Sequence, residues 1–155
     1  MVVKSVNVTT VEKWLIKADG LDPISLYVED KSPSQAKITI EVFGDAWSYY
    51  WGAMGDRGWK DFILSADNEY LVRKFIPMDR RTETDLERIK READLPSWIE
   101  HINDIRLVED RMVDHYGDDW YMGLPTRNTS ETNNLYRILD AIKESLALQR
   151  QADVV

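Results

Sequence analysis

The sequence predicts an α+β fold in which a small antiparallel sheet of about three strands packs against helices. Two observations indicate this class. Apolar and polar residues alternate along the first part of the 155-residue chain, as they do in strands with one buried face. In the second half, apolar residues recur three and four positions apart, the spacing of an amphipathic helix. Runs of strands followed by runs of helices are typical of α+β proteins.

Three strands are predicted in the first half. The first covers residues 13–18, where apolar and polar side chains alternate, and it ends before Gly20. Alternation resumes over 24–28 and again over 38–42. The polar segment 29–37 between them contains a proline, so these two strands are expected to form an antiparallel hairpin with one solvated face.

A run of aromatic residues follows the hairpin. Trp47, Tyr50 and Trp51 stand three and four positions apart, which predicts a short helix that the following glycines end. The aromatic side chains of this segment are expected to pack on the sheet. The sequence thus predicts one core, whose members are Trp14, Ile16, Leu26, Val28, Ile38, Ile40, Val42, Trp47, Trp51 and Phe62.

The rest of the chain is predicted to be helical. Helices are expected at about 59–63, 70–75, 82–93, 96–116 and 128–150. Asp67 is placed to cap the second of these helices. Pro96 suits the first turn of the fourth, and Gly117 ends it. Asn128 and Glu131 form a capping-box pattern before the clear apolar stripe of the last helix.

The amino-acid composition indicates a globular protein without disulfides or a membrane-spanning segment. With 43% hydrophobic and 31% charged residues, the chain is expected to fold as a single domain over 1–150, with 151–155 as a frayed tail. It contains no cysteine, which excludes disulfides and thiolate chemistry and favours a reducing cytoplasm. No apolar run reaches the roughly 20 residues that cross a bilayer, so no membrane partner is expected.

The chain is acidic. Its 28 Asp and Glu residues exceed its 20 Lys and Arg residues, which gives a net charge of -8. Such a charge repels nucleic-acid phosphates, so direct binding of DNA or RNA is not expected. Two interpretations of the acidic excess stay open: it keeps the protein in solution, or it complements a basic partner.

Signatures of catalysis are missing from the sequence. It has no phosphate loop GxxxxGK, no dinucleotide motif GxGxxG, no nucleophile elbow GxSxG and no zinc motif HExxH. The two histidines, His101 and His115, stand fourteen residues apart on one predicted helix. That separation is about 21 Å along the axis, so they cannot share a metal ion. We therefore expect no enzymatic activity, no cofactor and no metal.

Acidic residues gather in two places. Glu83, Asp85 and Glu87 lie close to several basic residues, whereas the second cluster has only Arg111 among its members. The second cluster consists of Glu109, Asp110, Asp114, Asp118 and Asp119. It stands near the end of a predicted helix, where carboxylates are mildly unfavourable, so stability alone does not account for it. We predict that this cluster binds a partner protein.

An aromatic anchor would lengthen the residence time of such a complex. Trp120 directly follows the acidic cluster. Trp59 stands beside a glycine-rich turn that also contains Arg57, a place where a large aromatic side chain is often half exposed. These three residues complete the predicted partner-binding site.

Two alternatives stay open. Asp110, Asp114, His115 and Asp118 could hold a metal ion in a small hydrolase or nuclease, because residues four apart share a helix face. The aromatic turn around Trp59 could stack the bases of a single-stranded nucleic acid, although such sites normally include a basic groove.

Several short motifs point to a source. The segment from Gly20 to Phe75 contains LDP, ED before the hairpin loop, KITIE, a W…YWG.MG cluster and DNEYL. As a set, these motifs resemble a group of small uncharacterised proteins encoded in bacteriophages and prophages, with a weaker similarity over Leu124 to Leu146. The resemblance implies a phage accessory protein acting in the cytoplasm of a bacterial host cell, and it carries no site residues.

Small acidic phage proteins often act by binding rather than by catalysis. By this analogy, we expect a non-catalytic inhibitor of the anti-CRISPR or anti-restriction type. Its partner would be a host defence or nucleic-acid-processing protein with a basic surface. The oligomeric state is left open by the sequence.

Overall fold

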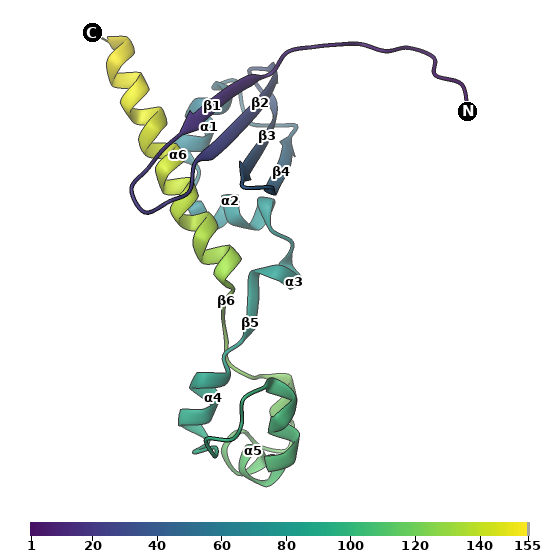
Figure 1. The fold of residues 1–155 in the computed structure, drawn as a ribbon, viewed down its shortest axis with the longest axis vertical. Coiled ribbons are helices and arrows are strands. Elements are labelled where there is room, and N and C mark those ends of the chain that lie inside the picture. Colours follow the sequence, from purple (N-terminus) through teal and green to yellow (C-terminus); the bar gives the residue numbers. More distant parts are fainter. Residues whose placement is uncertain (155) are drawn as a thin grey trace. The chain divides into compact units, whose positions relative to one another are not determined.

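The computed structural model describes residues 1–154, and the chain forms two compact units (Figure 1). Unit 1 consists of Met1–Pro77 together with the chain from Asn134 onward, and unit 2 is Met78–Asn133. Each unit has its own cluster of buried hydrophobic residues. In chain order, unit 2 is inserted into unit 1, and both lie in the single domain that the sequence predicts over 1–150.

Unit 1 contains a four-stranded antiparallel sheet with the order β1-β2-β3-β4. Its strands are β1 (Glu12–Ile16), β2 (Ile24–Ser32), β3 (Gln35–Val42) and β4 (Asp45–Trp51). In register, Trp14 lies opposite Leu26, Leu26 opposite Ile40, and Ile40 opposite Trp47, so one face of the sheet is apolar across all four strands. The predicted α+β class and the predicted hairpin are confirmed.

The fourth strand corrects a prediction. Trp47, Tyr50 and Trp51 belong to β4, not to a helix. Trp47 and Trp51 are four residues apart, and this even spacing places two side chains on the same face of a strand as well as of a helix. Phe43 (φ 51°) and Gly44 (φ 94°) form a tight turn with two positive φ angles, the geometry that joins antiparallel strands. Aromatic residues also favour strands.

Three helices cover the apolar face of the sheet in unit 1 (Figure 1). They are α1 (Gly58–Ser65), α2 (Asn68–Phe75) and α6 (Ser130–Val154). Asp67 caps α2 as predicted, since its carboxylate accepts the N–H of Tyr70 at 2.7 Å. At the start of α6 the cap is the Thr129 hydroxyl, which accepts the N–H of Thr132, rather than the predicted Asn128.

The core of unit 1 is largely the predicted one. Eight of the ten expected members are buried, and Trp14 and Phe62 pack half-buried against them. The apolar stripe of α6 joins this core through Leu135, Ile138, Leu139, Ile142 and Leu146. The helix continues to Val154, across residues 151–154 of the predicted tail, and residue 155 lies outside the described chain.

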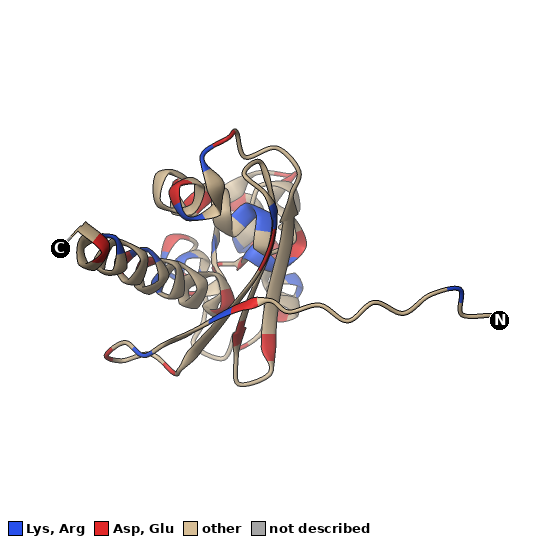
Figure 2. Cartoon of the chain, turned by 90° about the horizontal axis from the view of Figure 1, so that it is seen from above, with Lys and Arg blue, Asp and Glu red and all other residues tan. Residues whose placement is uncertain are grey.

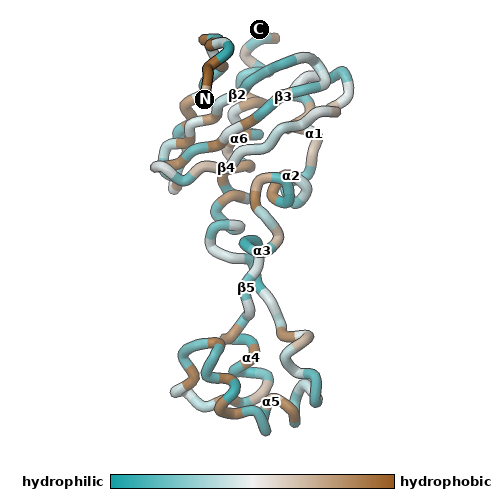
Figure 3. Tube along the Cα trace, turned by 90° about the vertical axis from the view of Figure 1, so that its right-hand side faces the viewer, coloured by the Kyte–Doolittle hydropathy of each residue, from teal (hydrophilic) through white to brown (hydrophobic). Residues whose placement is uncertain are grey.

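Unit 2 is built from short elements. They are α3 (Met78–Arg81), β5 (Thr82–Thr84), α4 (Leu86–Glu92), the 3-10 helix η1 (Ile102–Val108), α5 (Glu109–Tyr116), the 3-10 helix η2 (Trp120–Met122) and β6 (Thr126–Asn128). Strands β5 and β6, where the chain enters and leaves the unit, pair antiparallel. Figure 3 colours the hydrophobic positions along this unit, and seven of its hydrophobic residues are buried together as a second core.

The long helix predicted over 96–116 is divided in the structure. A 3-10 segment precedes α5, and only the last part is α-helical, ending before Gly117 as expected. Asp104 explains the late start, because its carboxylate accepts the N–H groups of Glu100 and His101 and so fixes a non-helical turn there.

Candidate functional site

The five carboxylates predicted to bind a partner lie on or just after α5. Glu109 and Asp110 are in its first turn, Asp114 is in its last turn, and Asp118 and Asp119 follow Gly117. All five side chains are exposed, and none forms an ion pair within residues 1–154. We call these five residues the acidic surface.

In the other acidic cluster, Glu83 and Asp85 stabilise the fold of unit 2. The Glu83 carboxylate pairs with Arg127 at 2.9 Å across the β5–β6 ladder. Asp85 caps α4 by accepting the N–H of Arg88 at 3.0 Å. Unlike Glu83 and Asp85, the five carboxylates of the acidic surface have no hydrogen-bond or ion-pair partner within residues 1–154, so they are available to a partner protein.

Charge is divided unevenly between the units. Of the 28 acidic and 20 basic residues, unit 2 contains 14 and 8, and unit 1 contains the remaining 14 and 12. Unit 2 therefore carries a net charge of -6 and unit 1 a net charge of -2. The negative potential of the protein is concentrated in the smaller unit.

The position of α5 is fixed by a core contact and a polar network. Met112 is buried in the second core. The Tyr116 hydroxyl donates to the Glu92 carboxylate at 2.7 Å, and the Arg88 guanidinium donates to the same carboxylate at 2.7 Å. Burial, with this hydrogen bond, raises the pKa of Tyr116 to about 12, and the Arg88 hydrogen bond lowers the pKa of Glu92.

The arginine within the acidic surface is occupied elsewhere. Arg111 donates to the backbone carbonyl of Asp94. Asp94 has a positive φ of 50°, so this contact stabilises an unusual backbone conformation at the end of α4. The bond also holds the guanidinium of Arg111 at the loop after α4.

Both predicted aromatic anchors are buried, which corrects their proposed role. Trp59 is only 3% exposed and meets Trp14 edge-on, with ring centroids 6.0 Å apart. Trp120 is 9% exposed and lies in the second core. Arg57 is exposed, but its guanidinium donates to the Met54 carbonyl and the Ser65 hydroxyl. Helix α1 begins at Gly58, which turns Trp59 toward the sheet.

Other apolar side chains, which the sequence analysis missed, are exposed around the acidic surface. Leu107 comes two residues before Glu109, and Tyr121 and Met122 come two and three residues after Asp119. These three side chains are 74%, 63% and 76% exposed. Their spacing gave no signal, because the 3-10 turn η2 directs Trp120 inward and its neighbours outward.

The residues of the metal alternative do not form a cluster. Among residues 1–154, no group of three or more His, Cys, Asp or Glu side chains is close enough to hold a metal ion. His101 and His115 are both exposed, and the His115 ring lies edge-on to that of Tyr116, with centroids 4.5 Å apart.

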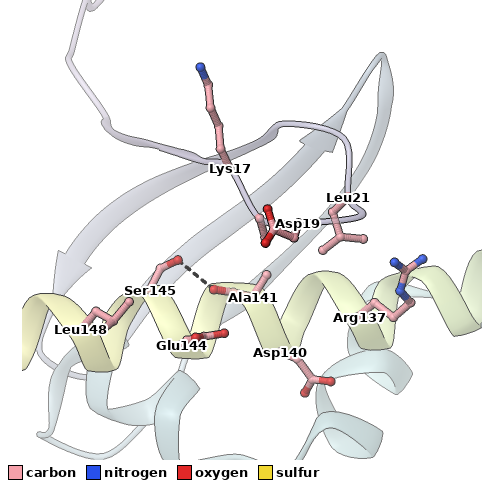
Figure 4. Close-up of a pocket in the computed structure, with 10 residues that line it drawn as sticks. Lys17, Asp19, Leu21, Arg137, Asp140, Ala141, Glu144, Ser145 and Leu148 are labelled. Atoms are coloured by element: carbon pink, nitrogen blue, oxygen red, sulfur yellow. Dashed lines mark hydrogen bonds between the residues drawn. The ribbon is translucent and has the colours of Figure 1, made fainter.

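Unit 1 contains an open cleft of about 520 Å³ between the β1–β2 connection and α6 (Figure 4). Arg137 closes one end by donating to the Gly20 carbonyl at 2.6 Å. The lining of the cleft includes three carboxylates and two cations, namely Asp19, Asp140, Glu144, Lys17 and Arg137. Figure 4 shows the Lys17 side chain directed away from α6. With charges of both signs, the lining favours neither an anionic nor a cationic ligand.

Comparison with known protein families identifies the family of this chain. Residues 1–147 match the model of a phage family, Phage_phiTE_072. The chain belongs to this phage family. The match confirms the resemblance to phage proteins, and it spans unit 2 as well as unit 1. Neither the curated proteins nor the solved structures contain a match to the chain. Within residues 1–154, no helix has both the length and the hydropathy needed to cross a bilayer.

Proposed function

We propose that this phage-family protein is a non-catalytic inhibitor that binds a basic surface of a host defence or nucleic-acid-processing protein in the bacterial cytoplasm. The anti-CRISPR or anti-restriction type of inhibitor fits this description. The observation that supports the proposal is the acidic surface of unit 2, with five exposed carboxylates that have no ion-pair partner within residues 1–154.

Helix geometry separates the acidic surface into two parts. Glu109 and Asp110 lie in the first turn of α5, where the helix dipole favours negative charge, so stability can account for them. This differs from the sequence analysis, which placed the whole cluster near a helix end. Asp114, Asp118 and Asp119 lie near or beyond the C-terminal end of the helix, where the dipole disfavours them. These three residues support the proposal most strongly.

The exposed apolar side chains supply the other half of an interface. Rim charges mainly accelerate association, while buried aromatic and apolar contacts slow dissociation. Tyr121 and Met122 follow Trp120, a short distance along the chain from the acidic residues, and are exposed, so they replace Trp59 and Trp120 as the proposed anchors. The expected partner surface is therefore basic with an apolar pocket.

Charge reversal tests the proposal. The protein is used to capture partners from host lysate, and the captured proteins are identified by mass spectrometry. The test variant carries Asp114→Lys, Asp118→Lys and Asp119→Lys. The control variant carries Asp22→Lys, Asp45→Lys and Asp56→Lys, three exposed carboxylates of unit 1 without ion pairs within residues 1–154.

Both variants change the net charge equally, so only the location of the change differs. We expect the wild type and the control to retain a host protein with a basic surface, and the test variant to lose it. Equal retention by the test variant at raised salt, or capture of nothing by the wild type, would contradict the proposal. Tyr121→Ala should increase the dissociation rate of the complex with the captured protein and change its association rate less.

A further inference from the structure

Residues 1–11 form an extended arm that precedes β1. In unit 1 the arm extends away from the sheet, and it belongs to no helix or strand (Figures 1 and 2). No hydrogen bond or ion pair joins it to the rest of the chain within residues 1–154. Its one charged residue is Lys4. Its five valines are all exposed, Val8 at 93%.

The composition of the arm is that of a strand. Seven of its eleven residues are Val or Thr, which favour extended structure. Even-numbered residues of β1 face the core, as Trp14 and Ile16 show. Since side chains alternate along an extended chain, Val6 and Val8 continue the core-facing side of β1. At Val6 and Val8 the arm therefore has neighbouring apolar side chains on one face with nothing packed against them.

Strand β2, beside β1, is too short to receive the arm. Glu12 is the first paired residue of β1, and it lies opposite Val28. Strand β2 ends at Ser32, so only four of its residues extend beyond that pair. Most of the arm extends past the end of β2, so it could pair along its length only with another strand.

The free edge of β4 is a suitable acceptor. Within residues 1–154, strand β4 pairs with β3 and with no other strand, so its other edge is open to a further strand. Proteins often protect an edge strand from pairing with another chain by a Lys, a Pro or a β-bulge. Strand β4 contains no Lys and no Pro, and its register with β3 has no shift. Phe43 and Tyr50, next to this edge, are exposed aromatic residues that an added strand could cover.

We propose that the arm of one copy adds as an extra strand to the β4 edge of a second copy. The arm would form main-chain hydrogen bonds with β4, and Val6 and Val8 would lie on the same face as Trp47 and Tyr49. Reciprocal exchange, in which each copy donates one arm and receives one, gives a closed homodimer.

The first experiment measures mass in solution by light scattering and sedimentation over a range of concentrations. The wild type should have the mass of two chains. Val6→Asp with Val8→Asp places charges on the apolar face and should weaken the dimer about 100-fold or more. Ser5→Asp with Asn7→Asp places the same charges on the opposite face and should leave most of the affinity. Circular dichroism checks that each variant is folded.

The second experiment uses the absence of cysteine from the sequence. Ser48 is exposed on β4, so Ser48→Cys is combined in turn with Ser5→Cys, Asn7→Cys and Thr9→Cys, which alternate onto the same face. At least one combination should form a disulfide between two chains under mild oxidation. In the control, Lys13→Cys on β1 replaces Ser48→Cys and should give no such product.

Three results would overturn the proposal. One is a wild type with the mass of a single chain at every concentration. Another is a dimer that the Val6 and Val8 substitutions leave unchanged. The third is cross-linking that occurs within one chain, or equally well with the β1 control. None of these results depends on the proposed host partner.

Discussion

The two units of this protein differ in how they are stabilised and in what they expose. Unit 1 has long paired strands, a 25-residue helix and a core rich in aromatic side chains, and its charges nearly balance. Unit 2 has short helices, a smaller core and most of the net negative charge. Most of the net negative charge therefore lies on an insertion of short elements and not on the unit that has the long strands and the larger core.

Removing unit 2 is the largest change that tests this comparison. Thr84 and Thr126 lie directly opposite each other in the β5–β6 ladder. Replacing residues 85–125 with Asn-Gly would close the ladder with a two-residue hairpin turn. We expect unit 1 to keep its fold, because its core includes no residue from the removed segment. Near-ultraviolet circular dichroism of the Trp47 and Trp51 environment checks this, and a molten spectrum would contradict it.

A core substitution in unit 1 should have the next largest effect. The Trp51 ring lies within 4.8 to 5.6 Å of the rings of Tyr49, Phe62 and Phe75, measured between centroids. Trp51→Ala should lower the free energy of unfolding by about 3–5 kcal/mol. Urea unfolding followed by circular dichroism measures the change. Tyr50→Ala, on the exposed face of the same strand, is the control and should cost less than about 1 kcal/mol.

A matching substitution in unit 2 tests whether the two cores are independent. Met112 is fully buried in the second core. Met112→Ala should cost about 2–4 kcal/mol, and the loss should be confined to unit 2. Hydrogen exchange should therefore rise across residues 78–133 and stay unchanged in the strands of unit 1. Exchange that rises equally in both units would show a single cooperative structure.

The smallest effect concerns the hydroxyl of Tyr116. Tyr116→Phe removes its hydrogen bond to Glu92 and should cost unit 2 about 1 kcal/mol at neutral pH. The folded pKa of about 12 exceeds the ordinary value of 10.0, so the folded state holds this proton more tightly. Its contribution is complete below pH 10 and is lost as the pH rises toward 12.

Thermal unfolding of unit 2 at several pH values measures this contribution. The wild type should lose stability between about pH 10 and 12 more steeply than Tyr116→Phe. Parallel curves for the two proteins would show that the hydrogen bond adds nothing to stability. Arg88→Gln is a useful companion, because it removes the other hydrogen bond to the Glu92 carboxylate without changing the tyrosine.

Local patterns in the sequence determined much of this protein. Alternation predicted the hairpin of β2 and β3, because one face of each strand must be apolar to be buried. The three-and-four stripe predicted α6, and Asp67 predicted the start of α2. The acidic surface was also readable from sequence alone, since charged side chains that have no partner in their own chain remain exposed. Each of these features depends on residues close together in the chain.

Tertiary structure decided the remainder. Trp47 and Trp51 share a face in a strand and in a helix alike, and only pairing with β3 selected the strand. Trp59 and Trp120 are buried because the sheet and the second core receive them, which no local pattern reveals. The division into two units follows from the pairing of β5 with β6, over forty residues apart in sequence. Contacts between distant residues fix these features, and a single sequence does not record which distant residues will meet.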